Sequence, residues 1–410
     1  MQEIADGYHR RMKILVVHNR YHYRGGEDTV VDAEVSLLRS HGHDVLIYSR
    51  DNHELQAMSR RAAAMGVLWS RRTVSDIRTL QKDFQPDLIH SHNTFPLISP
   101  SLYAIAHALR IPVVQTLHNF RLLCPQAMLL RDGVSCEACV GHLPWRAVVH
   151  RCYRQSFPQS AITATMIFMH RLRGTWVHQV SRYIVLNQLC RDKFVQGGLP
   201  FERMRIKPNF VQAQGEPEWT GRCGGLFIGR LSPEKGLHTL ALAMQQLSSI
   251  QIDVFGNGPL QSLVEGTPGL HYRGYHDAAT LQQRLRRAAY LVMPSTGVES
   301  FGLAAIEAFA CGTPVIASRH GGLMEIVVHG KTGLLVQPGD ADALANAIAY
   351  AEAHPDRMLA MGRAAHDTYL RCYTPETNYV LLMRIYREAL ASLPSAQSSP
   401  LPYAETRPGR

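Results

Sequence analysis

Long apolar stretches are missing from this sequence of 410 residues. No stretch approaches the roughly 18 consecutive apolar residues that a membrane-spanning helix needs. The opening residues, MQEIADGYHRRM, also lack the apolar run of a secretory signal peptide. These absences argue against an integral membrane protein and against a secreted protein, and we expect the protein to lie in the cytoplasm.

Acidic residues are scarce in the first half of the chain. Residues 1–210 hold 27 Lys and Arg against 16 Asp and Glu, whereas the remaining residues hold 16 against 17. A basic half favours an anionic partner, such as a phospholipid surface, a phosphorylated substrate or a nucleic acid. Ordinary solubilising charge is the alternative interpretation. The sequence has no recognisable nucleic-acid-binding motif, so we do not expect a nucleic acid as the partner.

Two common cofactor signatures are also missing. The first junction between a strand and a helix, YRGGED, contains Gly25 and Gly26 but not the G-x-G-x-x-G of a dinucleotide-binding loop. The sole D-x-D, formed by Asp340 and Asp342, stands where a helix is expected to start, and a helix cap explains it better than a metal site does. We therefore expect no catalytic metal.

The sequence does contain two series of apolar strand patterns. The first runs from KILVVHN through DVLIYS, DLIHSH, PVVQTLH and YIVLN, and the second runs from GGLFIGR to GLLV. These runs are too continuous for a sheet with one wet face, which predicts parallel strands covered by helices on both sides. We predict two Rossmann-like, doubly wound α/β domains at residues 12–208 and 209–375, separated by a segment rich in Pro and Gly.

Three further segments lie outside these two domains. Residues 1–11 are predicted to form a disordered leader, and residues 395–410 a disordered tail. The helical pattern at 376–394 is expected to cross back and brace the first domain. Because ligands bind at the carboxyl ends of strands in open parallel sheets, two such domains facing each other would share a cleft.

The apolar stretch GVESFGLAAIEAFACGTPVIASRHGG carries two acids, Glu299 and Glu307. Eight positions are two helical turns plus about 80°, so on one helix the two acids would point in different directions. We expect the helix to begin near Ser300 or Phe301, which leaves Glu299 in the preceding loop. The unpaired N–H groups of that helix start would attract a phosphate. Glu307 would need hydrogen-bond donors such as ribose hydroxyls, and a structural ion pair is the alternative.

Two cations and two glycine-containing segments complete this constellation. Arg230 directly follows a strand in FIGRLSPEKG, and Lys235 comes five residues later. Gly302 would let a ligand approach the helix start closely. Another Gly-rich strand end, VFGNGPL, contains Gly256 and Gly258. Two cations, a helix start and a carboxylate together indicate a nucleoside diphosphate site.

With these motifs the sequence resembles glycosyltransferase family 4, the retaining nucleotide-sugar enzymes with the GT-B fold. The matching residues are GRLSPEKG, GNGP, ESFGLAAIEAFACGTPVIAS and GGLMEIV…GKTGLLV, and the resemblance spans residues 12 to about 390. It implies a hexosyltransferase in which Arg230 and Lys235 hold the donor diphosphate, Glu299 contacts the transferred sugar and Glu307 binds the ribose. It also implies that one segment binds a phosphate, namely Ser300, Phe301, Gly302 and Leu303.

The resemblance implies a UDP- or GDP-sugar donor and a saccharide or lipid-linked acceptor, in the assembly of cell-surface polysaccharide. Fixed cations stabilise a departing diphosphate more in the transition state than in the ground state. The implied mechanism is a same-face displacement in which the leaving phosphate takes the proton of the acceptor. Two other interpretations stay open: a sugar-nucleotide epimerase with the same fold, and a non-catalytic protein that binds sugar nucleotides.

The first domain supplies candidates for the acceptor side. In the family, glycines at the position of Gly25 and Gly26 let the acceptor or the donor pass close to the backbone, and a simple helix entry is the alternative. His118, which ends the strand PVVQTLH, matches a family histidine that contacts the donor sugar, and a structural histidine is the alternative. Three asparagines at strand ends are weaker candidates: Asn93, Asn119 and Asn187.

Four of the eight cysteines fall within 29 residues, inside a predicted insert at 120–155: Cys124, Cys136, Cys139 and Cys152. Their spacing, with a C-E-A-C pair in the middle, is typical of a closed structural zinc site. His142 or His150 could replace one of the four ligands. Disulfides do not suit a cytoplasmic chain, and reduced buried thiols are the alternative to zinc.

Two segments combine basic and large apolar residues, AMSRRAAAMGVLWSRRTVSDIR and MIFMHRLRGTWVH. Helices of this kind can lie on an anionic membrane surface. The sequence thus supports the hypothesis that the enzyme contacts the inner face of the membrane peripherally, where a lipid-linked acceptor would lie. Packing of both helices inside the domain is the alternative.

Overall fold

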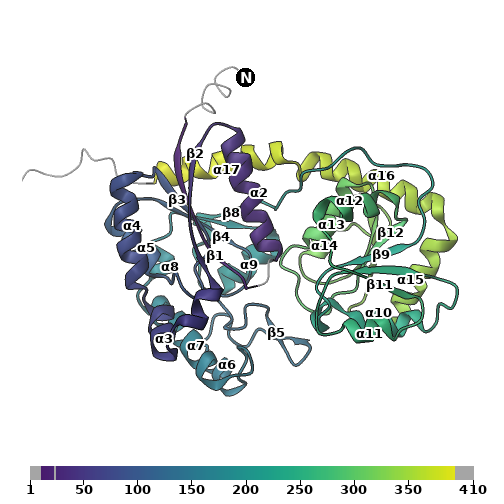
Figure 1. Ribbon diagram of the computed structural model, residues 1–410, viewed down its shortest axis with the longest axis horizontal. Coiled ribbons are helices and arrows are strands. Elements are labelled where there is room, and N and C mark those ends of the chain that lie inside the picture. The colour runs from purple at the N-terminus through teal and green to yellow at the C-terminus, as the bar shows by residue number, and fades with distance from the viewer. Residues whose placement is uncertain (1–10, 23–24, 393–410) are drawn as a thin grey trace, which may run out of the picture.

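The computed structural model describes residues 11–22 and 25–392, and its ribbon has two lobes that lie side by side (Figure 1). The predicted disordered leader, apart from Arg11, and the predicted tail lie outside the described residues. No helix in the described ranges has both the length and the apolar character that crossing a membrane requires.

The first lobe is built on a parallel sheet with the strand order β2-β1-β3-β4-β7-β8. Alternate residues of β1 pack into two different hydrophobic clusters: Leu15 and Val17 into one, Ile14 and Val16 into the other. Both faces of the sheet are therefore covered, which explains why the strands are apolar throughout. The strands are β1 (Lys13–Arg20), β2 (Asp44–Asp51), β3 (Leu88–Asn93), β4 (Val113–Leu117), β7 (Arg182–Val185) and β8 (Met204–Ile206).

Helices cover both faces of this sheet. Several start at side-chain caps, because an oxygen of Ser59, Ser70 or Asn187 accepts a backbone N–H of the first turn of α3, α4 or α9. A small hairpin, β5 (Leu130–Arg131) and β6 (Val134–Ser135), lies in the insert before α6. The helices are α2 (Gly26–Ser40), η1 (Asn52–Ala57), α3 (Arg60–Leu68), α4 (Arg71–Asp83), α5 (Ser101–Ala108), α6 (Trp145–Val149), α7 (Phe157–Leu172), α8 (Thr175–His178), α9 (Gln188–Gln196) and η2 (Phe201–Arg203).

The second lobe repeats this architecture with the parallel strand order β11-β10-β9-β12-β13-β14. Its strands are β9 (Gly225–Ile228), β10 (Ile252–Phe255), β11 (Leu270–Gly274), β12 (Tyr290–Met293), β13 (Val315–Ser318) and β14 (Gly333–Val336). Its helices are η3 (Pro233–Lys235), α10 (Leu237–Met244), α11 (Gln261–Glu265), α12 (Ala278–Arg287), α13 (Leu303–Ala310), α14 (Leu323–Ile326), α15 (Ala341–Ala353) and α16 (Pro355–Cys372). The prediction of two doubly wound α/β domains is confirmed.

Each sheet has one point at which the chain direction across the sheet reverses. In the first sheet this point lies between β1 and β3, and in the second it lies between β9 and β12. Loops at the carboxyl ends of such neighbouring strands diverge, which leaves a crevice where ligands of open α/β sheets bind. The loops after β9 and β12 contain Lys235 and Glu299, so the topology alone brings these two residues to one crevice.

The last described helix, α17 (Pro375–Leu390), follows α16 of the second lobe but packs on the first (Figure 1). Leu382, Met383 and Tyr386 are buried in the same cluster as Ile14 and Val16 of β1. The helix ends at Leu390, earlier than the predicted boundary at 394. The two lobes are thus joined by the segment before β9 and by this returning helix.

Candidate active site

Lys235 and Glu299 meet at the crevice of the second domain. Lys235 Nζ lies 2.6 Å from Glu299 Oε1, and Ser295 Oγ donates a hydrogen bond of 2.8 Å to the same oxygen. Burial would raise the pKa of Glu299, but the charge and hydrogen bond of Lys235, with that of Ser295, hold it below its usual value. Glu299 is therefore a charged carboxylate, and Lys235 is the cation that compensates it.

The turn after Glu299 leads into α13, which begins later than predicted. Gly302 is the residue before the helix and has a φ of 100°, in the left-handed region, so the helix starts at Leu303 instead of Ser300 or Phe301. A Cβ atom at position 302 would lie 2.5 Å from Leu323 Cδ2. Phe301 is buried against Tyr373, with ring centroids 6.1 Å apart. The side chain of Phe301 is thus a packing group, and a ligand at this turn would meet backbone N–H groups.

Glu307 occupies the middle of α13 in a different environment from Glu299. Its carboxylate has no hydrogen-bond donor and no ion-pair partner among the described residues. Burial raises its pKa to about 7. A half-buried acid without a partner is costly unless a ligand supplies donors, so the structural ion pair considered as an alternative is absent from the described part of the chain.

Arg230 and the two glycines of the GNG turn belong to adjacent loops. The Arg230 side chain is exposed, and its guanidinium has no hydrogen bond or ion pair to any described residue. A Cβ atom at Gly256 would lie 1.9 Å from Gly229 O, and one at Gly258 would lie 2.3 Å from Leu231 O. Both glycines therefore allow the loop after β10 to pack against the backbone on either side of Arg230. The structure gives them this packing role whether or not they also touch a ligand.

His118 and the loop after β1 bring the first domain to this site. His118 follows β4, is buried, and accepts a hydrogen bond of 2.7 Å at its backbone oxygen from Ser300 Oγ of the second domain. Burial lowers the pKa of His118 to about 3, so its ring is neutral. Gly25 caps α2, and a Cβ atom at Gly26 would lie 3.7 Å from Leu303 Cδ2. The first turn of α2 therefore faces the first turn of α13 across the domain boundary.

The three asparagine candidates differ in what they contact. Asn93 bonds to the backbone of Asn19 and Phe95, which is a structural role. Asn187 caps α9 and donates a hydrogen bond of 2.7 Å to Ser300 O, so it joins the two domains. Asn119 Nδ2 donates to Glu27 Oε2 at 3.3 Å.

Glu27 is a residue of this region that the sequence analysis did not single out. Its Oε2 also accepts a hydrogen bond of 3.0 Å from Tyr21 OH, whereas its Oε1 is buried without a hydrogen-bond partner. Burial raises the pKa of Glu27. Next to it, Asp28 Oδ1 pairs with His18 Nε2 at 2.8 Å. The position of both acids directly after Gly25 and Gly26, at a strand-to-helix junction, is the signal that could have identified them.

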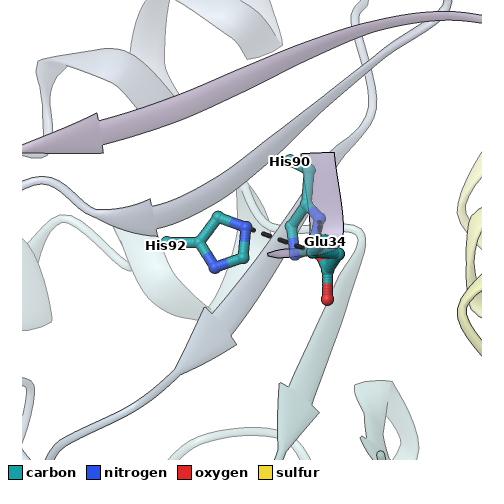
Figure 2. Close-up of side chains that lie close together, drawn as sticks. All are labelled: Glu34, His90 and His92. Carbon is teal, nitrogen blue, oxygen red and sulfur yellow. Dashed lines mark ion pairs between the residues drawn. The ribbon is translucent and has the colours of Figure 1, made fainter. Parts of the chain in front are cut away.

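A second group of polar side chains, also not predicted, lies inside the first domain next to His118. Glu34 of α2 points at His90 and His92 of β3 (Figure 2), and these three are the only set of three His, Cys, Asp or Glu ligand atoms in the described chain that lie within 4.8 Å of one another. Lys207 Nζ lies 2.9 Å from Glu34 Oε2. An ammonium group therefore already compensates the carboxylate, and a second cation beside it would be repelled.

The four clustered cysteines gather around the β5–β6 hairpin and α6. Cys124 and Cys139 are buried, Cys136 and Cys152 are partly exposed, and none forms a disulfide. Burial, and after it the neighbouring Cys124, raises the pKa of Cys139 to about 11 and also raises that of Cys152. The thiols thus lie within electrostatic range of one another, but no three of the four sulfur atoms lie within 4.8 Å. The side chains of His142 and His150 are exposed.

Comparison with known proteins finds a family match for each half of the chain. Residues 225–368 match the family described as Glycosyl transferases group 1, and residues 24–214 match Glycosyltransferase Family 4. The chain is 24% identical to the sulfoquinovosyl transferase SQD2 of Arabidopsis thaliana, over 81% of this chain and 65% of that protein. It is 26% identical to a glycogen synthase of Mycobacterium tuberculosis, over 75% of this chain and 70% of that protein. The chain thus spans about two thirds of the length of these two relatives.

Solved structures with the same architecture include a sucrose-phosphate synthase and a protein in complex with UDP-glucose. Sucrose-phosphate synthase from Thermosynechococcus elongatus superposes with a TM-score of 0.70 and 21% identity, over 93% of this chain and 100% of that one. Anabaena Alr3699/HepE in complex with UDP-glucose superposes with a TM-score of 0.62 and 19% identity, over the same shares. These likenesses establish the fold, and the two family matches cover both domains. The chain therefore belongs to the glycosyltransferases of family 4, enzymes with the GT-B fold.

Proposed function

We propose that this glycosyltransferase moves a sugar from a nucleoside diphosphate to a saccharide or lipid-linked acceptor with retention of anomeric configuration, in cell-surface polysaccharide assembly. The observation that carries the proposal is the pair of Lys235 and Glu299, 2.6 Å apart beside the start of α13. A cation, a carboxylate and free backbone N–H groups are here within reach of one small ligand.

Each group of the site matches a part of a nucleoside diphosphate sugar. Cleavage of the anomeric bond leaves negative charge on the diphosphate, which Lys235, the exposed Arg230 and the first N–H groups of α13 would stabilise. The unpartnered Glu307 suits the ribose hydroxyls, and Glu299 suits the transferred sugar. Because Anabaena Alr3699/HepE is described in complex with UDP and with UDP-glucose, a uridine nucleotide is the first donor to test.

The acceptor would enter from the side of the first domain. The loop of Gly25 and Gly26 faces Leu303, and Glu27 follows with one carboxylate oxygen that has no hydrogen-bond partner and lies 3.9 Å from His18 Nδ1. That oxygen could accept a hydrogen bond from an acceptor hydroxyl. In the same-face mechanism the leaving phosphate takes the acceptor proton, so Glu27 would orient the hydroxyl without having to remove its proton.

The test is an assay of the purified protein with a panel of UDP- and GDP-sugars, with and without saccharide acceptors. We expect Lys235→Ala and Glu299→Ala each to lower turnover by about 100-fold or more. Lys331→Ala and Glu265→Ala remove exposed charges of the same kinds elsewhere in the second domain and should leave turnover unchanged. NMR of the product should show the anomeric configuration of the donor.

Three outcomes would contradict the proposal. Inversion of the anomeric centre would exclude the same-face mechanism. Conversion of the sugar nucleotide to an isomer without any acceptor would indicate an epimerase. Tight nucleotide binding with neither transfer nor donor hydrolysis would indicate a binding protein.

We also propose peripheral contact with the inner face of an anionic membrane. Large apolar side chains are exposed on α6 and α7, including Trp145 at 58% and Leu172 at 73%, and exposed Arg146 and Arg173 stand next to them. Such a surface combines apolar insertion with attraction to phospholipid head groups. Co-sedimentation with phosphatidylglycerol vesicles but not with phosphatidylcholine vesicles, lost in Trp145→Ala with Leu172→Ala, is the expected result. Equal recovery with both kinds of vesicle would exclude the contact.

For the cysteine cluster we propose a structural zinc ion held by Cys124, Cys136, Cys139 and Cys152. Burial and the neighbouring thiols raise the pKa of Cys139 to about 11, so zinc would displace the thiol proton on binding, and the resulting thiolates are the ligands that zinc prefers. Tetrahedral ligation at about 2.3 Å per bond would draw the sulfur atoms to about 3.8 Å from one another. We expect one zinc per chain by elemental analysis, retained in Cys372→Ser and lost in Cys139→Ser. Metal-free protein whose four thiols are all alkylated in the folded state would disprove the site.

A further inference from the structure

A row of buried polar side chains connects the interior of the first domain to His118. Between β3 and the end of β4 the side chains make two successive contacts: His90 Nε2 lies 2.8 Å from Thr116 Oγ1, and His92 Nδ1 lies 2.9 Å from Nε2 of His118, which follows β4 directly. His90 Nδ1 also lies 2.7 Å from Tyr386 OH of α17. His92 lies two positions after His90, and His118 lies two positions after Thr116. The second contact is therefore nearer the carboxyl ends of the strands and the cleft.

Glu34 and Lys207 form the charged end of this row. Their side chains are 2% and 1% exposed. Burial would raise the pKa of Glu34, but Lys207 and His90 outweigh it and hold the pKa well below its usual value. A buried ion pair is often no more stabilising than apolar residues of the same volume. The ion pair is therefore weak evidence for a purely stabilising role at this place.

One buried nitrogen in the row, His92 Nε2, has no hydrogen-bond partner and faces Glu34. Glu34 Oε1 lies 2.9 Å from His90 Nδ1 and 3.5 Å from His92 Nε2 (Figure 2). The carboxylate can only accept a hydrogen bond. The arrangement is therefore satisfied by a proton on His92 Nε2, pointing at Glu34, once the two side chains close the small remaining gap.

This proton position determines the protonation of the next ring. Burial lowers the pKa of His92 well below its usual value and that of His118 to about 3, so each ring is neutral and carries one N–H. With its proton on Nε2, His92 has a bare Nδ1, and only a proton on His118 Nε2 can complete the bond of 2.9 Å between the two rings. His118 Nδ1 is then unprotonated, and no described residue donates a hydrogen bond to it.

We propose that Glu34, acting through His92, is a positioning residue that fixes His118 in the Nε2–H tautomer, so that its bare Nδ1 accepts a hydrogen bond from a hydroxyl of the donor sugar. The inference rests on the proposed function, because it takes the donor sugar to lie against His118. Ser300 Oγ holds the backbone oxygen of the same residue at 2.7 Å. The ring is thus oriented from the first domain and its backbone from the second.

The charged and titratable groups around this row already have partners within the protein. The Lys207 ammonium also bonds to Asn378 Oδ1 of α17 at 3.1 Å. The His18 ring stands edge-on to that of His92, with centroids 6.3 Å apart, and pairs with Asp28 on its other side. A metal ion at Glu34, His90 and His92 would have to share the carboxylate with Lys207. Lys207 therefore already supplies the cation that compensates Glu34.

The first experiment reads the tautomer directly. In protein labelled with 15N at histidine, the ring-nitrogen shifts of His118, assigned by its loss in His118→Ala, should show a protonated Nε2 and a bare Nδ1. His92→Leu should release this preference and give a mixture of tautomers. Thr116→Val removes the first of the two contacts, at His90, at equal burial, and should leave the His118 signals unchanged. A protonated Nδ1 at His118 in the unmodified protein would overturn the inference.

The second experiment separates sugar recognition from nucleotide binding. His92→Leu should lower kcat/KM for the donor sugar nucleotide by about tenfold or more, which corresponds to one lost hydrogen bond, while the Kd for the nucleoside diphosphate alone stays unchanged. If His92→Leu does not fold, the double variant Glu34→Gln with Lys207→Met removes both buried charges and gives the same readout. Unchanged kcat/KM in a folded variant would overturn the inference. Absence of turnover in the unmodified protein would instead contradict the proposed function, and the tautomer measurement would still decide this point.

Discussion

At the scale of single residues, the two acids of the ESFGLAAIE segment show how strongly position decides chemistry. Glu299 is charged because Lys235 lies 2.6 Å away, whereas Glu307, without a cation, has its pKa raised by burial to about 7. The sequence predicts that the two acids point in different directions, but not that they differ in charge. Charge depends on neighbours that lie far along the chain, such as Lys235, 64 positions before Glu299.

The raised pKa of Glu307 predicts that nucleoside binding depends on pH. Near pH 7 about half of the free protein carries a protonated Glu307, and ribose hydroxyls donate best to the ionised form. Affinity for UDP should therefore rise between pH 6 and pH 8, and binding near pH 7 should release protons. Glu307→Gln should abolish the part of the pH dependence that belongs to the protein.

Isothermal titration in buffers of different ionisation enthalpy measures this proton release. The titration of UDP itself contributes equally to both proteins, so the comparison isolates Glu307, and Glu265→Gln serves as a control on an exposed acid. An identical pH slope in Glu307→Gln and the unmodified protein would show that Glu307 stays ionised or does not meet the ligand. The raised pKa of Glu307 also makes folding stability depend on pH, but in the opposite direction from UDP affinity. The contribution of Glu307 to folding stability is lost as pH rises from about 4.5 to about 7.

At the scale of elements, the strands were predictable and the helix start at the site was not. Continuous apolar runs such as KILVVHN fix β1 closely, because a strand covered on both faces tolerates few polar residues. The start of α13 depends on the left-handed backbone conformation of Gly302. Any residue with a Cβ atom at position 302 would clash with the side chain of Leu323. The pair of Glu34 and Lys207, 173 positions apart, was beyond prediction because no local pattern links α2 to the end of β8.

The returning helix α17 should contribute strongly to the stability of the first domain. Leu382 is fully buried in the cluster that contains Ile14 and Val16 of β1, so Leu382→Ala leaves a cavity there and should cost about 2–5 kcal/mol. Leu370→Ala, at an exposed site on α16, should change stability by less than about 0.5 kcal/mol.

Urea unfolding followed by tryptophan fluorescence can assign this loss. Trp69, Trp145 and Trp176 lie in the first domain, whereas Trp219 packs against Arg363 and His366 of the second, so the fluorescence of Trp219→Phe reports the first domain alone. A transition of the first domain that does not move in Leu382→Ala would show that α17 is dispensable for it.

At the scale of the whole molecule, the two domains are held at the site by a small number of polar contacts. Glu325 of α14 accepts hydrogen bonds from the backbone N–H groups of Gln188 and Leu189, at 2.9 Å and 2.7 Å. A carboxylate of the second domain thus caps the N-terminus of α9 in the first, which also favours it through the helix dipole. Ser300 and Asn187 add two further bonds across the same boundary.

Removal of this contact should loosen the boundary without unfolding either domain. In Glu325→Ala we expect the amides of Gln188 and Leu189 to exchange with deuterium at least about tenfold faster, because they lose their acceptors. The KM for the donor should rise, since closure of the domains over the substrate becomes less favourable. Hydrogen exchange read by mass spectrometry on the 185–196 peptide measures the first effect, and protection equal to that of the unmodified protein would contradict it. Glu265→Ala is the matched control.

The position of α17 also bears on how the chain is made. Ile14, Val16 and the apolar face of α2 share a core with a helix whose residues are synthesised some 360 positions later. On the ribosome this face of the first sheet is covered only in part, by α2, until almost the whole second domain has emerged. Nascent chains that stop short of residue 375 would therefore expose apolar surface of the first domain. We expect chaperones to bind such chains early.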